Sequence, residues 1–210
     1  MTTDHRRATV ERKTRETEIR VSVDLDGSGE ARVETPIGFL THMLETLGRH
    51  ALVDLEVRVA GDLHVDQHHT VEDTGMVLGA AIGKALGERR GISRAGWARH
   101  PMDEALADAA IDLSGRAHLT LEADFDDKKV GELRVSLLHD FFEALARALG
   151  ANVHLDLVRG RNDHHRVEAI FKAFARALRM AIAREPRLGE KVLSAKGSLD
   201  LGGSIAGGGG

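Results

Sequence analysis

Apolar positions in the chain follow two alternating periods, and each period predicts a different element. From residue 19 to residue 25 every second residue is apolar, a pattern typical of a half-buried strand. From residue 40 the apolar residues recur every three or four positions, as on one face of a helix, up to Gly48. The elements predicted in the first part of the chain are strands at 19–25, 31–33 and 53–59 and helices at 40–47 and 70–87.

The second part of the chain repeats this order of elements. The predicted elements are strands ending at Leu113 and covering 117–123 and 153–157, and helices at 137–149 and 164–184. Each part reads strand-strand-helix-strand-helix, which predicts an internal duplication with repeats near 16–91 and 105–190. Such units pack their helices on one face of each sheet, so we expect an α+β fold.

The same pattern predicts the domain organisation. We expect a single domain at 12–199, with a first half-repeat at 16–91 and a second at 92–199 that includes a connecting segment and the C-terminal basic residues. Residues 1–15 interleave basic and acidic side chains and predict a mobile N-terminal arm. Residues 200–210 are rich in glycine and predict a disordered tail.

Composition narrows the possible functions. A net charge of −4 argues against a nucleic-acid surface, and an aromatic content of 3% leaves few rings to stack on bases. The chain has no run of 18 apolar residues and no apolar signal region, so we expect a cytoplasmic protein that contacts neither membrane nor nucleic acid. Twelve histidines and no cysteine favour metal binding through imidazole and carboxylate groups.

One motif occurs twice: residues 68–72 and 164–168 both read His-His-x-x-Glu at the start of a predicted helix. Residues three or four apart share a helix face, so either histidine can chelate an ion together with the glutamate. Adjacent histidines point about 100° apart and suit two different ions. The simplest arrangement pairs His69 with Glu72 on one ion and gives His68 to the other. By the repeat, His165 pairs with Glu168 and His164 serves the second ion.

These two mixed sites of imidazole and carboxylate suit Mn, Fe, Zn or Ni better than Ca or Mg. The alternative is that the two motifs are solvated helix caps that bind no metal. That alternative would not explain why the two motifs match in both position and residue type. A further ligand is expected from His42, which lies among apolar residues of the preceding helix. Its counterpart in the second half is either His139 or Asp140, and the sequence leaves both open.

Two other features have simple chemical interpretations. Gly75, Gly79, Gly83 and Gly87 recur every four residues and predict close packing against another element. Arg94, Arg116 and the Ser194-Ala195-Lys196 segment are individually typical surface residues, but together they could form a phosphate pocket.

The motifs taken together resemble the imidazoleglycerol-phosphate dehydratase family of histidine biosynthesis. The residues that carry the resemblance are His68–Asp73, Pro101–Glu104, Asp112–Arg116, Asn162–Ala169 and Phe171–Ala173, and it extends from about Arg12 to Leu199. The resemblance implies a helical layer between two four-stranded sheets. It also implies a homo-oligomer, a 24-mer, with two Mn²⁺ in each active site between subunits.

The resemblance also implies roles for individual residues. One ion would take His42, His69, Glu72 and His164, and the other His68, His165, Glu168 and either His139 or Asp140. Phosphate contacts would come from Arg94, Arg116, Ser194 and Lys196, with Ala195 where threonine is usual, and Lys172 would line the substrate site. Substrate contacts would also come from His42, His68, His69, His164 and His165. Glu16 would act as acid or base, and the catalytic set would be Glu16, Glu72, Glu168, His69 and His165. Thr41 stands where aspartate is frequent in the family.

The expected reaction is the dehydration of imidazoleglycerol phosphate to imidazole acetol phosphate. The proton removed in it lies on a carbon that no carbonyl acidifies. A ring bound to a cation loses its N–H proton more readily, and the imidazolate expels the hydroxyl to give a diazafulvene-like intermediate. The alternatives are a dinuclear metallohydrolase, which would release phosphate, and a non-enzymatic metal-binding protein, which needs no phosphate pocket.

Overall fold

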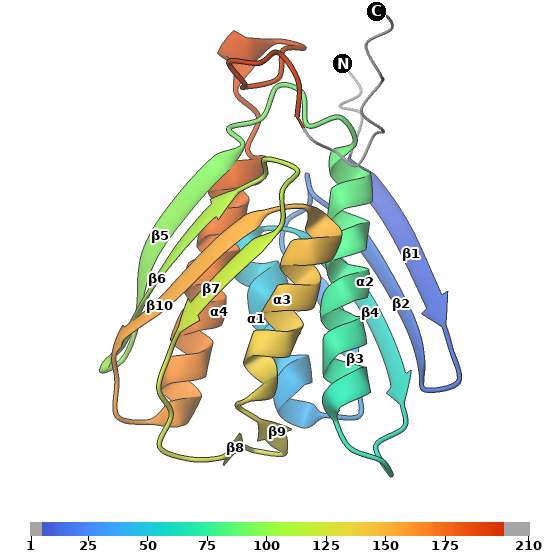
Figure 1. Ribbon diagram of the computed structural model, residues 1–210, viewed down its shortest axis with the longest axis vertical. Helices are drawn as coiled ribbons and strands as arrows, with labels where there is room; N and C mark the ends of the chain where they lie inside the picture. Colours follow the sequence, from blue (N-terminus) through green and yellow to red (C-terminus); the bar gives the residue numbers. More distant parts are fainter. Residues whose placement is uncertain (1–5, 200–210) are drawn as a thin grey trace, which may run out of the picture.

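In the computed structural model, which describes residues 6–199, four helices lie between two four-stranded sheets (Figure 1). The first sheet has the order β1-β2-β4-β3, and its strands are Arg7–Lys13, Thr17–Asp24, Asp54–Gly61 and Ala31–Glu34. The second has the order β5-β6-β10-β7, with strands Ala95–Met102, Ala105–Asp112, Asn152–Arg159 and His118–Glu122. The helices are α1 Gly38–Ala51, α2 His68–Leu86, α3 Leu137–Leu149 and α4 Asp163–Ile182. A short hairpin of β8 (Lys129–Val130) and β9 (Leu133–Arg134) precedes α3, and a 3-10 turn, Pro186–Leu188, follows α4.

The two sheets have the same topology, which confirms the α+β fold and the internal duplication. In each sheet the second strand in chain order pairs antiparallel with the fourth, and the third pairs parallel with the fourth. Each four-stranded sheet has one strand more than the apolar pattern predicts, β1 in the first and β5 in the second, and the short β8–β9 hairpin was not predicted either. The inward positions of β5 are Gly96, Ala98 and His100, which give almost no apolar alternation.

The predicted mobile arm at residues 1–15 is wrong for residues 7–13, which form β1 and pair with residues 18–24 of β2. Only Ala8 and Val10 supply apolar contacts, so the strand depends on backbone pairing. Its start is held by Arg6, whose guanidinium lies 2.6 Å from Asp26 and donates to the Ile182 carbonyl at 2.7 Å. The hydrogen bond from Arg6 lowers the pKa of Asp26 to about 2. Residues 1–5 and the Gly-rich tail at 200–210 lie outside the described residues.

The core fills the space between the sheets. Phe141 and Phe142 of α3 meet Phe171 and Phe174 of α4, with ring centroids 5.0–5.6 Å apart. All four rings are fully buried, so they fix the spacing of the two helices. No helix within residues 6–199 combines the length and apolarity needed to cross a membrane.

The glycine stripe on α2 packs against α3 at two of its four positions. A Cβ on Gly75 would lie 2.2 Å from the Phe141 carbonyl oxygen, and one on Gly79 would lie 2.4 Å from that of Leu145. The expected close packing is therefore confirmed there. Gly83 has room for a methyl group, and Gly87 ends the helix with a positive φ of 54°.

We expect Gly79→Ala to lower the free energy of unfolding by about 2–3 kcal/mol, because the methyl group overlaps backbone that cannot rotate away. Gly83→Ala is the matched control, one turn later on the same face. Its methyl would be 3.7 Å from the nearest atom, and the gain in helix propensity should stabilise the chain by up to about 1 kcal/mol. Urea unfolding of both variants measures the difference, and equal effects would contradict the close contact.

Candidate metal and substrate site

Both His-His-x-x-Glu motifs begin a helix at the same end of the helical layer, the lower end in Figure 1. A polar residue precedes each motif and fixes the first turn. The Asn162 side chain accepts from the backbone N–H of His164 at 2.9 Å, and Asp66 accepts from that of His68 at 2.8 Å. The helix α1 packs against α4, and α3 against α2, so each motif gains side chains from a second helix.

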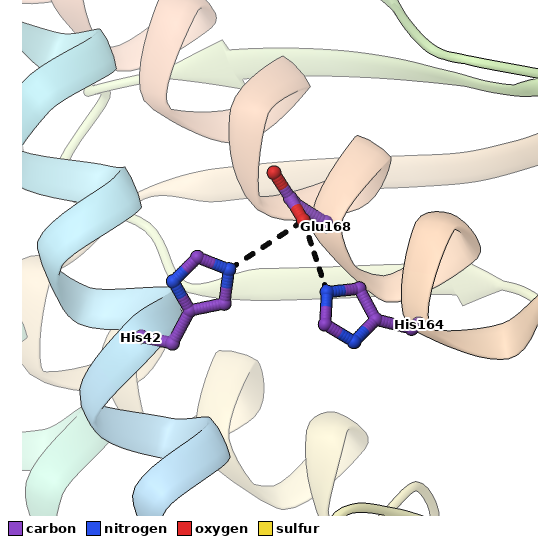
Figure 2. Close-up of side chains that lie close together, drawn as sticks. All are labelled: His42, His164 and Glu168. Atoms are coloured by element: carbon purple, nitrogen blue, oxygen red, sulfur yellow. Dashed lines mark ion pairs between the residues drawn. The ribbon is translucent and has the colours of Figure 1, made fainter.

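The tightest group of ligating side chains is His42 with His164 and Glu168. Nε2 of His42 lies 3.5 Å from Oε2 of Glu168, and Nε2 of His164 lies 3.2 Å from the same oxygen. Figure 2 shows both rings pointing toward the carboxylate, one from α1 and one from α4. The three ligand atoms lie within 4.8 Å of one another, and within residues 6–199 no other trio of such side chains is as close. Two imidazoles and one carboxylate fit a borderline divalent metal.

Glu168 is the buried member of this group, with 6% of its surface exposed. Burial raises its pKa, but the ion pair with Lys172, at 2.7 Å, and the neighbouring His42 outweigh burial and lower the pKa overall. The glutamate is therefore ionised at neutral pH, the state in which it can hold a cation. Lys172, expected to line the substrate site, lies at this cluster.

The motif at residues 68–72 forms a looser group of ligating side chains together with a residue of α3. Nε2 of His68 lies 3.7 Å from Glu72, and Nδ1 of His68 lies 3.6 Å from Asp140. His139 points elsewhere, 4.0 Å from Glu143, and is exposed. Of the two candidates that the sequence left open, Asp140 is thus the one beside the motif.

The pairing within the motifs differs from the expectation. We expected Glu72 to pair with His69 and Glu168 with His165. In the structure each glutamate lies beside the first histidine of its motif, four residues earlier. The resemblance also implied that His42 and Glu72 bind the same ion. Within this chain His42, on α1, lies beside Glu168 instead. Positions four apart stack almost directly along a helix, which explains the observed pairs.

His69 and His165 belong to neither set and are held by other carboxylates. Nδ1 of His69 lies 3.1 Å from Asp62, and Nδ1 of His165 lies 2.8 Å from Glu104. These hydrogen bonds raise the pKa of both histidines, and the contact with His165 lowers the pKa of Glu104 to about 2. Glu16 lies 3.9 Å from Nε2 of His69.

Asp62 and Glu104 were missed as site residues. Each had one signal in the sequence that could have marked it as a site residue. Glu104 lies in the Pro-Met-Asp-Glu motif, and Asp62 lies in the turn that precedes the first His-His pair.

The basic residues singled out in the sequence do come together. Arg94, Arg116, Ser194, Ala195 and Lys196 line one pocket of about 190 Å³, together with Ser114, Ser198 and Leu199. All three nitrogens of the Arg94 guanidinium are engaged, since Nε and Nη2 donate to the Asp112 carboxylate at 2.8 and 2.9 Å and Nη1 donates to the Leu193 carbonyl at 2.5 Å. Ser114, not predicted, is 3% exposed, and its hydroxyl has no hydrogen-bond partner among residues 6–199. Such a pocket suits a small anion.

The pocket and the histidines lie at opposite ends of the helical layer. The backbone N–H of Arg94 donates to the carbonyl of Ala181, at the C-terminal end of α4. His164 lies at the other end, 17 residues earlier, which corresponds to about 25 Å along the helix axis.

The sequence and the fold have counterparts in known proteins. The family model for imidazoleglycerol-phosphate dehydratase matches residues 35–178. The chain belongs to this family. It is 54% identical over 194 residues to the imidazoleglycerol-phosphate dehydratase of Granulibacter bethesdensis, a match that covers 92% of this chain and 99% of the relative.

Solved structures of imidazoleglycerol-phosphate dehydratases have the same fold. The Staphylococcus aureus enzyme superposes with a TM-score of 0.76 at 34% identity, over 85% of this chain and 99% of its own. The Pyrococcus furiosus enzyme gives a TM-score of 0.78 at 35% identity, over 90% and 100%. A dehydratase is a carbon-oxygen lyase, so the prediction of an enzyme of the hydro-lyase class is confirmed.

Proposed function

We propose that the chain dehydrates imidazoleglycerol phosphate to imidazole acetol phosphate and water, a step of histidine biosynthesis in the cytoplasm. Membership of the family supports the reaction. The observation that carries the proposal is the convergence of His42 and His164 on the ionised Glu168, because this donor set suits the metal that the reaction needs.

We propose two Mn²⁺ ions in each active site, held by two sets of side chains. One ion is held by His42, His164 and Glu168, and the other by His68, Glu72 and Asp140. His69 and His165 take part in neither set within the chain, so they are available to ions held by neighbouring copies. A bound cation makes the N–H proton of the substrate ring more acidic.

A complete site requires more than one chain. The substrate joins its imidazole ring to its phosphate through three carbons, which cannot span the roughly 25 Å between the His-Glu group and the basic pocket of one chain. We therefore propose that the basic pocket of one chain faces the His-Glu group of another chain in a homo-oligomer. This oligomer would be the 24-mer that the resemblance to the family implies.

The protein side chains then have separable roles. Arg94, Arg116 and Lys196 hold the phosphate, which fixes the ring at a set distance from the metals. Glu16 lies on the β1–β2 turn, exposed beside His69, and takes the proton from the carbon of the substrate. Lys172 keeps Glu168 ionised and in place.

A direct assay tests the function. The protein is incubated with Mn²⁺ and imidazoleglycerol phosphate, the ketone product is followed by its absorbance at high pH, and inorganic phosphate is measured in parallel. We expect product without phosphate release. Phosphate release would favour a metallohydrolase, and bound metal with neither product would favour a non-enzymatic metal-binding protein.

A further inference from the structure

His69 and His165 occupy equivalent places in the duplicated motif, and each is held in the same way. In both rings Nδ1 faces a carboxylate from outside the motif, at 3.1 Å for Asp62 and 2.8 Å for Glu104. The first histidines of the motifs instead lie beside Glu72 and Glu168 of their own motifs, and Nδ1 of His68 is 3.6 Å from Asp140, beyond hydrogen-bond distance.

The two carboxylates are not a product of the duplication. Asp62 follows the end of β4, whereas Glu104 lies in the turn between β5 and β6. By the matching strand registers of the two sheets, Asp62, after β4, corresponds to Gly160, after β10, and Glu104, in the β5–β6 turn, corresponds to Glu16, in the β1–β2 turn. Glu16 lies near Nε2 of His69 and not near its Nδ1. The same contact therefore arose twice from unrelated positions, which indicates that the histidines need it.

Backbone hydrogen bonds hold the Glu104 carboxylate and the main chain of Asp62 in place. The other oxygen of Glu104 accepts from the backbone N–H groups of Arg161 and Asn162, at 3.1 and 2.9 Å. Asp62 donates its own backbone N–H to the Glu16 carbonyl at 3.0 Å, and its side chain is 12% exposed. A fixed carboxylate accepts a hydrogen bond from Nδ1–H, and this leaves the lone pair on Nε2.

We propose that Asp62 and Glu104 are positioning residues that fix the tautomer and direction of His69 and His165, so that Nε2 of each ring is presented to a metal held by a neighbouring copy. The inference rests on the proposed function, since it requires a metal that these rings reach. Nε2 of each ring faces the open side, where the nearest carboxylates, Glu16 and Asp103, are 3.9 and 3.7 Å away and exposed.

The test measures Mn²⁺ affinity of the full-length assembled protein, with free Mn²⁺ followed by electron paramagnetic resonance. Asp62→Ala is expected to weaken binding by about 10–100-fold. Asp62→Asn should restore part of the loss, because its amide oxygen still accepts from Nδ1–H. Glu104→Gln keeps an oxygen for the backbone of residues 161–162 but turns an N–H toward Nδ1, so binding should also fall by about 10–100-fold.

Two comparisons separate positioning from a general structural role. Glu143→Ala removes a carboxylate beside the exposed His139 and should leave Mn²⁺ affinity unchanged. In a His69→Ala background, Asp62→Ala should cause no further loss, because it acts through that ring. Either of two results would overturn the inference alone. One is an Mn²⁺ affinity within about twofold of the parent for both Asp62→Ala and Glu104→Gln. The other is that Asp62→Ala weakens Mn²⁺ binding as much in the His69→Ala background as in the parent. A parent that binds no Mn²⁺ would overturn it together with the proposed metal.

Discussion

Glu168→Gln is expected to lower kcat/KM by at least about 10³-fold. Both imidazoles approach Oε2 of this carboxylate, which loses its charge, and the Lys172 ammonium, 2.7 Å from Oε1, loses its ionic partner. Metal bound per chain should fall in the same preparation. Steady-state kinetics and elemental analysis of the purified protein measure the two effects.

Glu122→Gln, on the exposed edge strand β7, is the control for this substitution and should retain activity. Thermal unfolding of the Glu168→Gln protein shows whether the chain still folds, and His164→Ala provides a second route to the same metal loss. If the Glu168→Gln protein retained metal and activity, the assignment of this group as a metal site would be wrong.

Glu16→Gln is expected to lower kcat by about 10²–10⁴-fold, the usual contribution of a general base. The metal content and the size of the assembly should stay unchanged, because Glu16 lies outside both His-Glu sets and its side chain is half exposed. This combination distinguishes proton transfer from metal binding. Rapid-quench kinetics on metal-loaded protein would measure it.

Glu18→Gln is the matched control for Glu16→Gln, two residues further along and paired with Lys13 at the surface. Its kcat should equal that of the parent. A kcat within about threefold of the parent for Glu16→Gln would remove Glu16 from the role of base, since such a change lies far below the range for that role.

The apolar periods predicted most of the fold because the long elements bury one clear face. The four helices and the central strands β2, β4 and β10 carry continuous apolar patterns. The edge strands β1 and β5 were missed because they bury little side-chain area and pair through backbone. A strand of that kind leaves almost no periodic signal.

The sequence predicted which kinds of residue form the site but not which side chains lie next to one another. The repeated motif indicated the histidines and glutamates, whereas the choice between His68 and His69 for Glu72 depends on side-chain direction along a helix. Asp140 could be separated from His139 only once α3 was seen against α2. Contacts from distant turns, such as Glu104 to His165, have no local signature in the sequence.

The central claim is that one active site takes its phosphate pocket and its metal group from different chains. Two inactive variants test it: Glu168→Gln, with an intact pocket, and Arg116→Ala, with an intact His-Glu group. They are mixed in equal amounts as dissociated chains, reassembled with Mn²⁺, and assayed against each variant alone.

Random reassembly should restore about a quarter of parental activity. Each site then has a chance of one half of receiving an intact phosphate pocket and, independently, a chance of one half of receiving an intact His-Glu group. Activity no higher than the sum of the two separate variants would contradict the claim and place both parts of the site on one chain.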